Sequence, residues 1–389
     1  MGNVYRTVYR TLVLKYDLLK LPPEVAEKVS ALLKVQEEFR LWTAEWARSG
    51  GSLSSPELNP LKYFAKRFLH SVEMLNWLKG LKKNGIELKK MRPPLIFNAQ
   101  LRLSEERDIS RGVFIDVPRK VVRIRKWSGA RGNTITLPLS ESAVRWILGR
   151  VREGGRLVLV VVWVGPSRWN RATRLYMALI FRRETAPIRP ERLLVVDLNA
   201  LHNGVSWAVV ERGRVLKKGV LRPDVSRILR LQKVASRLDS LCAEKDERCD
   251  EAVAVKSRIW RLLRVWEVDA VKELIWMARK RKAAIVVDVP DDKSIRELKE
   301  GGYVSERKAF LSLGHIRRRL RGLAEWYGVP YREERLYSTM CPRCGRKMEV
   351  LPNRRVKCQC GFETHRDEVP FHWAAKLYPK LISFSNSSF

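Results

Sequence analysis

The sequence lacks long apolar runs. No window reaches the roughly 18 uninterrupted apolar residues that a membrane-spanning helix requires. Met1 leads directly into strand-like sequence that shows no secretory signal pattern. We therefore expect a cytoplasmic protein that has no membrane partner.

Acidic residues are also scarce relative to basic ones. The chain has 42 Asp and Glu residues against 77 Lys and Arg residues, which gives a formal net charge of +35. Surface ion pairs of the thermophile type would explain many of these charges but not the excess of one sign. A positive field of this size attracts polyanions, so nucleic acid is the leading partner.

Cysteines are few, and four of the six form two close pairs near the C-terminus. Cys341-Pro-Arg-Cys344 and Cys358-Gln-Cys360 are separated by a short basic segment. Two such pairs on a hairpin have the spacing of a four-thiolate structural zinc site, a zinc ribbon. The second pair is one residue tighter than usual, so His365 is an alternative ligand. Chance pairing and a redox dithiol are the competing explanations.

The remaining two cysteines, Cys242 and Cys249, flank a charged segment. We expect free thiols in a reducing cytosol, with a disulfide as the alternative if the source is a hyperthermophile.

At 389 residues the chain exceeds what one hydrophobic core usually supports, so several domains are expected. The first half predicts a strand over 4–15, then two helices, one from Pro22 and one carrying Phe64, Phe68, Val72, Leu75 and Leu78. Six further short strands follow between 95 and 182. This pattern predicts a small β-barrel with inserted helices, and an ordinary sandwich without a binding role is the alternative.

Basic and aromatic residues in these strands and loops favour a nucleic-acid surface. The candidates are Arg123, Arg125, Lys126, Trp127, Arg131, Trp169, Arg171 and Arg174.

After a Pro-containing linker, the second half changes character. The apolar run 193–196 ends on Asp197, and two more strand-like runs complete a meander. Two long helices are predicted over 224–245 and 251–282, followed by a second apolar run that ends on Asp288. A helix over 307–326 and a strand over 331–336 lead into the cysteine pairs.

Asp197 and Asp288 each end a strand apolar enough to be buried on both faces, so they are expected at one edge of an α/β sheet. Asp291 and Asp292 compete with Asp288 for the second position. Asp367, delivered by the ribbon, would be the third acid. Adjacent carboxylates repel, and Mg²⁺ or Mn²⁺ would satisfy all three. Two such ions about 4 Å apart can hydrolyse a phosphodiester. A turn or helix-cap role is the alternative for each acid taken alone.

The second half presents these features in order: strand-Asp197, two long helices, strand-Asp288, the Tyr337-Ser-Thr-Met-Cys341 entry into a ribbon, and the His365-Arg-Asp367 exit. This order resembles that of the TnpB family. These are transposon-encoded, RNA-guided DNA nucleases, formerly called OrfB transposases and related to compact type V CRISPR effectors. The family usually has Glu at the position of Asp288 and Asp at that of His365.

The resemblance implies a multidomain α+β protein. It implies a wedge-like β-barrel over 1–20 and 92–186, with a helical recognition insertion over 21–91. A RuvC-like, RNase H-type nuclease domain would occupy 187–338 and 362–389, and the zinc ribbon 339–361. Asp197, Asp288 and Asp367 would hold magnesium, and structural zinc would lie in the ribbon.

By the same resemblance, the partners are a guide RNA and the double-stranded DNA target that the guide matches beside a short flanking motif. We expect a monomer, associated with the nucleoid of a prokaryotic cell when it is bound to DNA. Two alternatives remain open: an RNA-guided DNA-binding protein with a weakened or inactive nuclease, and an RNA-independent transposase.

Overall fold

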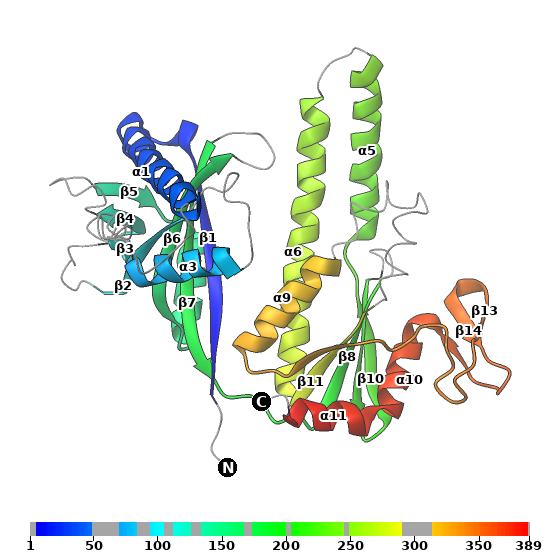
Figure 1. The fold of residues 1–389 in the computed structure, drawn as a ribbon. Helices are drawn as coiled ribbons and strands as arrows, with labels where there is room; N and C mark the ends of the chain where they lie inside the picture. The colour runs from blue at the N-terminus through cyan, green and yellow to red at the C-terminus, as the bar shows by residue number, and fades with distance from the viewer. Residues whose placement is uncertain are drawn as a thin grey trace. The chain divides into compact units, whose positions relative to one another are not determined.

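In the computed structural model, the described residues are 5–48, 70–83, 94–104, 112–125, 134–166, 173–199, 204–244, 249–289 and 313–387. The chain divides into two compact units (Figure 1). The N-terminal unit is Thr7–Glu184, and the C-terminal unit is Thr185–Phe389 together with Met1–Arg6. No helix in the described part of the chain is long and apolar enough to cross a membrane.

The N-terminal unit is built on a seven-stranded sheet with the order β1-β7-β6-β2-β3-β4-β5. Its strands are β1 (Arg6–Asp17), β2 (Leu95–Arg102), β3 (Gly112–Asp116), β4 (Val121–Arg125), β5 (Thr134–Pro138), β6 (Arg156–Pro166) and β7 (Thr173–Thr185). β2 and β3 are parallel, whereas β2 with β6, β3 with β4, β4 with β5 and β6 with β7 are antiparallel. Every strand predicted in this half is therefore present.

Three α-helices are described in this unit. They are α1 (Pro23–Arg48), α3 (Ser71–Lys83) and α4 (Glu141–Arg152). α1 buries an apolar stripe that includes Val29, Leu32 and Phe39, because these residues recur at helical spacing. Phe64 and Phe68 of the second predicted helix lie outside the described residues. α4 was not predicted from the sequence. It begins at the N-cap Ser140, whose hydroxyl accepts a hydrogen bond from the Ala143 amide.

The C-terminal unit contains a mixed five-stranded sheet with the order β10-β9-β8-β11-β12. Its strands are β8 (Arg192–Leu198), β9 (Val205–Glu211), β10 (Arg214–Leu221), β11 (Ala283–Asp288) and β12 (Tyr331–Glu334). β8, β9 and β10 form the predicted antiparallel meander. β11 is parallel to both β8 and β12. The carboxyl ends of β8 and β11 therefore lie at the same edge of the sheet.

Helices cover both faces of this sheet. The α-helices described in this unit are α5 (Val225–Glu244), α6 (Asp250–Lys280), α9 (Leu313–Trp326), α10 (Val369–Lys376) and α11 (Tyr378–Ser387), and all but α5 pack on the sheet. α6 and α9 pack on one face through residues such as Leu274 and Leu320. α10 and α11 pack on the other through residues such as Phe371 and Leu381. Burial from both sides explains why β8 and β11 read as continuous apolar runs.

A third, small sheet forms the ribbon between β12 and α10. It consists of β13 (Glu349–Val350), β14 (Arg355–Lys357) and β15 (Glu363–His365), all antiparallel. Two short 3-10 helices, η5 (Pro352–Arg354) and η6 (Arg366–Glu368), precede β14 and follow β15. η6 connects the ribbon directly to α10.

Cys242 and Cys249 form a disulfide in the structure, so the expectation of free thiols was wrong and the alternative holds. Their Cα atoms lie 5.5 Å apart, within the distance that a disulfide can bridge. The end of α5 and the start of α6 bring the two residues together.

Candidate active site

Asp197 and Asp288 face each other across two neighbouring parallel strands. In the register of β8 with β11, Asp288 lies directly opposite Asp197. Parallel strands are about 4.8 Å apart, so the two carboxylates start from adjacent backbone positions. The residues before each aspartate, from Leu193 to Val196 and from Ala283 to Val287, are buried. The sequence prediction that both acids lie at one sheet edge agrees with this geometry.

Asp197 is buried beside polar side chains. Its Oδ2 accepts a hydrogen bond of 2.7 Å from Nδ2 of Asn199. The same Asn199 amide lies 3.5 Å from Oγ of Ser206 on β9, which is also buried. Burial, and after it the negative charge of Asp288, raises the pKa of Asp197 to about 7. The charge of Asp367 adds to this increase, so the ionised form of Asp197 is unfavourable in the folded protein.

Asp288 is held by backbone contacts. Its Oδ1 accepts a hydrogen bond of 2.8 Å from the amide of Leu336, which follows β12. Burial raises the pKa of Asp288 even though this amide stabilises the charged form. The competing candidates Asp291 and Asp292 lie outside the described residues.

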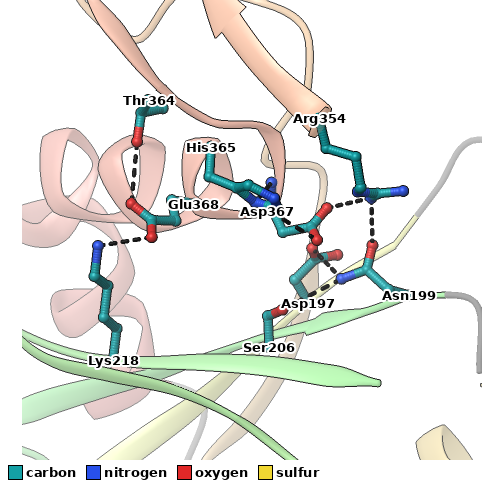
Figure 2. A network of polar contacts seen from close by, with 9 residues as sticks. All are labelled: Asp197, Asn199, Ser206, Lys218, Arg354, Thr364, His365, Asp367 and Glu368. Carbon is teal, nitrogen blue, oxygen red and sulfur yellow. Dashed lines mark hydrogen bonds and ion pairs between the residues drawn. The ribbon is translucent and has the colours of Figure 1, made fainter. Parts of the chain in front are cut away.

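Asp367 reaches the site from the ribbon side. It lies in η6, where the N-cap His365 accepts a hydrogen bond of 3.3 Å from the Asp367 amide. Its carboxylate is buried and forms an ion pair with Arg354. The same Arg354 Nη2 donates a bond of 3.3 Å to Oδ1 of Asn199. Figure 2 shows the Asp197, Asn199, Arg354 and Asp367 side chains directed toward one another.

A second polar group ties the Asp367 turn to the sheet. Glu368 accepts a bond of 2.6 Å from Lys218 on β10 through Oε1 and one of 3.0 Å from Thr364 on β15 through Oε2 (Figure 2). Burial opposes ionisation here, but the bonds from Lys218 and Thr364 outweigh it and lower the pKa of Glu368. Glu368 therefore joins the five-stranded sheet to the ribbon immediately beside Asp367.

The donor set suits a hard divalent cation. Three carboxylates converge, and burial and the acidic neighbours raise the pKa of Asp197. The raised pKa indicates that the site lacks positive charge, which such a cation would supply. The carboxylates are less closely gathered than the cysteines: among the described residues, the three aspartates are not a group whose ligand atoms all lie within 4.8 Å. Arg354, bound to Asp367, supplies part of the positive charge.

The cysteines form the second candidate metal centre. The four Sγ atoms all lie within 4.8 Å of one another, with Cys341 3.5 Å from Cys360 and Cys344 3.4 Å from Cys358. A tetrahedral site with Zn–S bonds of about 2.3 Å has sulfur atoms roughly 3.8 Å apart, so the cluster fits zinc. His365 caps η6 and is not part of this cluster, so the alternative ligand is not needed.

Local backbone geometry explains how the two pairs converge. Gly345 and Gly361 follow the cysteine pairs with φ of 76° and 81°, a conformation that favours glycine. Their amides donate to the Cys341 and Cys358 carbonyls at 2.9 and 3.0 Å. The first bond spans four residues and the second spans three, so the tighter second pair closes in a turn that is one residue shorter.

The predicted basic surface is only partly described. Arg123 lies 3.7 Å from Asp116, and Arg174 lies 3.9 Å from Asp17, in two intramolecular ion pairs. The Arg125 guanidinium lies 5.9 Å from the centre of the Phe114 ring. These contacts give the three arginines structural roles in the N-terminal unit. The remaining candidates lie outside the described residues: Lys126, Trp127, Arg131, Trp169 and Arg171.

Sequence reasoning missed Asn199, Arg354 and Glu368. Asn199 could have been found, because a polar residue two positions after a strand-end acid lies at the same edge. Arg354 could not, because it precedes Asp367 by 13 residues and reaches it only through the ribbon fold.

The comparisons with known proteins agree with this organisation. Residues 314–370, from α9 through the ribbon to the start of α10, match the family model of the Cas12f1-like TNB domain. No curated protein matches the sequence.

Among solved structures, the chain is similar to Cas12f1 in a cryo-EM complex with sgRNA and target DNA. That match has 11% identity and a TM-score of 0.54, and it covers 94% of this chain and 99% of that one. A CRISPR-Cas12f ternary complex matches with 12% identity and a TM-score of 0.35 over 90% and 84% of the two chains. CasPhi-2 (Cas12j) bound to crRNA matches with 11% identity and a TM-score of 0.36 over 96% and 98%.

The first of these matches shows a mixed α/β multidomain fold similar to that of Cas12f1. The family model independently places the ribbon and Asp367 within one domain type. Together, these two findings show a fold similar to that of Cas12f1 and a Cas12f1-like TNB domain over 314–370.

Proposed function

We propose that this protein is an RNA-guided, divalent-metal-dependent DNA endonuclease encoded by a transposable element. One observation carries the proposal: Asp197 lies directly opposite Asp288 on adjacent parallel strands, and the ribbon delivers Asp367 to their vicinity. Three carboxylates from distant parts of the chain, one of them with a pKa raised by burial and by the other two, are a typical arrangement for a metal-assisted phosphodiester hydrolase.

The residues present assign roles within the site. Asp197, Asp288 and Asp367 would hold Mg²⁺ or Mn²⁺. Such ions, when bound, supply an activated water and stabilise the leaving oxygen of the phosphodiester. Asn199 orients the Asp197 carboxylate through its 2.7 Å hydrogen bond. Arg354 fixes Asp367 and places a guanidinium beside the carboxylates, where an anionic phosphate would need a cationic partner.

The partners proposed are a guide RNA and a double-stranded DNA target. The similarity to Cas12f1, whose structure contains sgRNA and target DNA, and the formal net charge of +35 support them. We assign a wedge-like barrel to 1–20 and 92–186 and a recognition region to 21–91. The RuvC-like nuclease domain would be 187–338 and 362–389, with the ribbon at 339–361. Base pairing of the guide would read the target sequence.

A second candidate function is guide-dependent DNA binding with a weakened nuclease. Contacts within the protein favour it, because all three acids already have protein partners: Asp197 accepts a bond from Asn199, Asp288 accepts one from the Leu336 amide, and Asp367 pairs with Arg354. Asp288 is also one methylene shorter than the Glu that is usual in the family, so its carboxylate lies further from a metal.

Purification of the protein with its bound RNA tests the proposal and separates it from the alternatives. We expect one discrete RNA species to co-purify, and a DNA duplex matching that RNA to be cut in Mg²⁺ while a scrambled duplex is not. Tight guide-dependent binding without cleavage over a range of metals and temperatures would support the second candidate instead. DNA strand transfer by RNA-free protein would establish an RNA-independent transposase and overturn the proposal.

A further inference from the structure

Most of the surface of α5 is not used by the fold. Only Ile228 and Ala235 of this helix are fully buried. Ile228 packs with Ile259 and Leu263 of α6, and this small cluster joins the two helices. Figure 1 shows α5 and α6 running side by side away from the five-stranded sheet. The side of α5 that faces away from α6 is therefore open.

The open side of α5 carries a row of positive charge. Arg227, Arg230, Lys233 and Arg237 are all exposed, and their spacings of three, three and four residues place them along one side of the helix. At 1.5 Å per residue, the row is about 15 Å long. Within the described part of the chain, none of these four side chains forms an ion pair or a hydrogen bond. We call these four residues the α5 basic row.

Among the described residues, neighbouring acids do not neutralise this row. Asp224 caps the helix by accepting a bond of 3.0 Å from the Arg227 amide, and α5 has no acidic residue in its first turn. Asp239 lies toward α6, where it pairs with Lys256 at 2.6 Å. The row thus combines like charges at adjacent helical positions with positive charge near a helix N-terminus, both of which disfavour the helix. A contribution to folding does not explain it, but an anionic partner does.

The row begins at the sheet edge that carries the candidate active site. β10 ends at Leu221, which lies opposite Val205 on β9. Val205 in turn lies opposite Leu198 on β8, the residue that follows Asp197. With strands about 4.8 Å apart, the end of β10 is roughly 10 Å from the end of β8. α5 starts within a few residues of that point. The basic row therefore starts close to the carboxylates and leads away from them.

We propose that the α5 basic row binds the phosphate backbone of the substrate DNA beside the bond that is cut. This inference rests on the proposed function. Charge complementarity and the position of the row identify the occupant. About 15 Å of duplex presents roughly nine phosphates, enough to engage all four cations. Contacts of this kind hold and position DNA without reading its sequence.

The test uses the full-length protein with its co-purified RNA. The variant Arg230→Ala/Lys233→Ala/Arg237→Ala removes three charges from the row. We expect its affinity for guide-matched DNA to fall by about tenfold or more at physiological salt. The slope of log K against log salt should become less negative by roughly 2 to 3, since each phosphate contact contributes about 0.7 to 0.9.

A control with the same charge loss is available in the same unit. Lys256, Lys272 and Lys282 are exposed and pair with acids at 2.6, 3.6 and 3.1 Å. Replacing these three by alanine should change the salt slope by less than about 1. An equal loss of DNA affinity in this control would overturn the inference, because net charge alone would then explain the effect.

Two further results decide the matter. Unchanged DNA affinity and salt slope in the row variant would overturn the inference, as would a loss of guide RNA affinity in place of DNA affinity. Circular dichroism checks that α5 remains folded. If the triple variant does not fold, Arg230→Gln alone should shift the slope by about 0.9. Failure of the proposed function would look different, because Asp197→Ala would then cut DNA as well as the parent does.

Discussion

Replacing Asp197 by asparagine separates the effect of the Asp197 charge on stability from its effect on metal-dependent activity. Asparagine has the shape of the neutral carboxylic acid and can still accept the hydrogen bond from Asn199. It cannot ionise, so it removes the repulsion from Asp288 and Asp367. We expect Asp197→Asn to abolish metal-dependent activity and, without metal, to make the C-terminal unit more stable at pH 8.

The magnitude follows from the pKa of Asp197. Its ordinary value is 3.8, and burial with the neighbouring carboxylates raises it to about 7 in the folded protein. At about 1.4 kcal/mol for each pKa unit, ionising Asp197 in the folded state costs up to about 4 kcal/mol. The pKa of Asp197 is higher in the folded protein than in the unfolded chain. The parent therefore has its full stability below pH 4 and loses up to this amount as the pH rises through 7. For a unit of this size, 4 kcal/mol corresponds to roughly 10 °C in melting temperature.

Thermal unfolding of the parent and Asp197→Asn at pH 5 and pH 8, each with EDTA or with Mg²⁺, measures the effect. At pH 5 the variant's advantage should fall to about 1.6 kcal/mol, since Asp197 is then protonated in the folded protein but already ionised in the unfolded chain. At pH 8 in EDTA the variant should melt higher, and Mg²⁺ should stabilise the parent but not the variant. Asp239→Asn, at an exposed carboxylate paired with Lys256, is the control and should show neither effect. Equal or lower melting of Asp197→Asn at pH 8 would refute the electrostatic reasoning.

Two further predictions concern the ribbon. Cys344→Ser should lower the zinc content from about one ion per chain, as measured by mass spectrometry. It should also reduce cleavage, because Asp367 follows the ribbon. Full zinc content in this variant would contradict the four-thiolate site. Glu368→Gln should weaken the Lys218 contact and slow cleavage on the order of tenfold while KM for DNA stays constant, because Glu368 positions the Asp367 turn. A change in KM alone would assign Glu368 to DNA binding instead.

Much of the C-terminal unit could be predicted because local and global signals agree there. The apolar runs before Asp197 and Asp288 are strands buried on both faces, and such runs have few alternative placements. Parallel strands separated by a crossover bring their carboxyl ends to one edge, so the pairing of the two acids followed from topology. The cysteine spacing likewise predicted a cluster, because close pairs on a hairpin converge in only a few ways.

The parts that sequence could not predict depend on contacts between distant residues. Arg354 meets Asp367 and Asn199 only because η5 and η6 lie close together in the folded ribbon. Lys218 precedes Glu368 by 150 residues, and no local pattern connects them. Arg123 and Arg174 each pair with an acid of their own unit, a contact that charge alone does not reveal, and their place at a nucleic-acid surface stays a prediction.

The Cys242–Cys249 disulfide shows a different limit. Two cysteines near a helix connection can be free or bonded, and the choice depends on the distance between their backbones and on the redox environment. The sequence contains neither quantity, so it allowed both outcomes.

Cleavage of a guide-matched DNA duplex in Mg²⁺ by the parent, Asp197→Ala and Asp367→Ala tests the central claim most directly. We predict that the parent cuts and that both variants bind the duplex with the parent's guide dependence but leave it intact. Cleavage by either variant at the parent's rate would contradict the assignment of these carboxylates to the metal site.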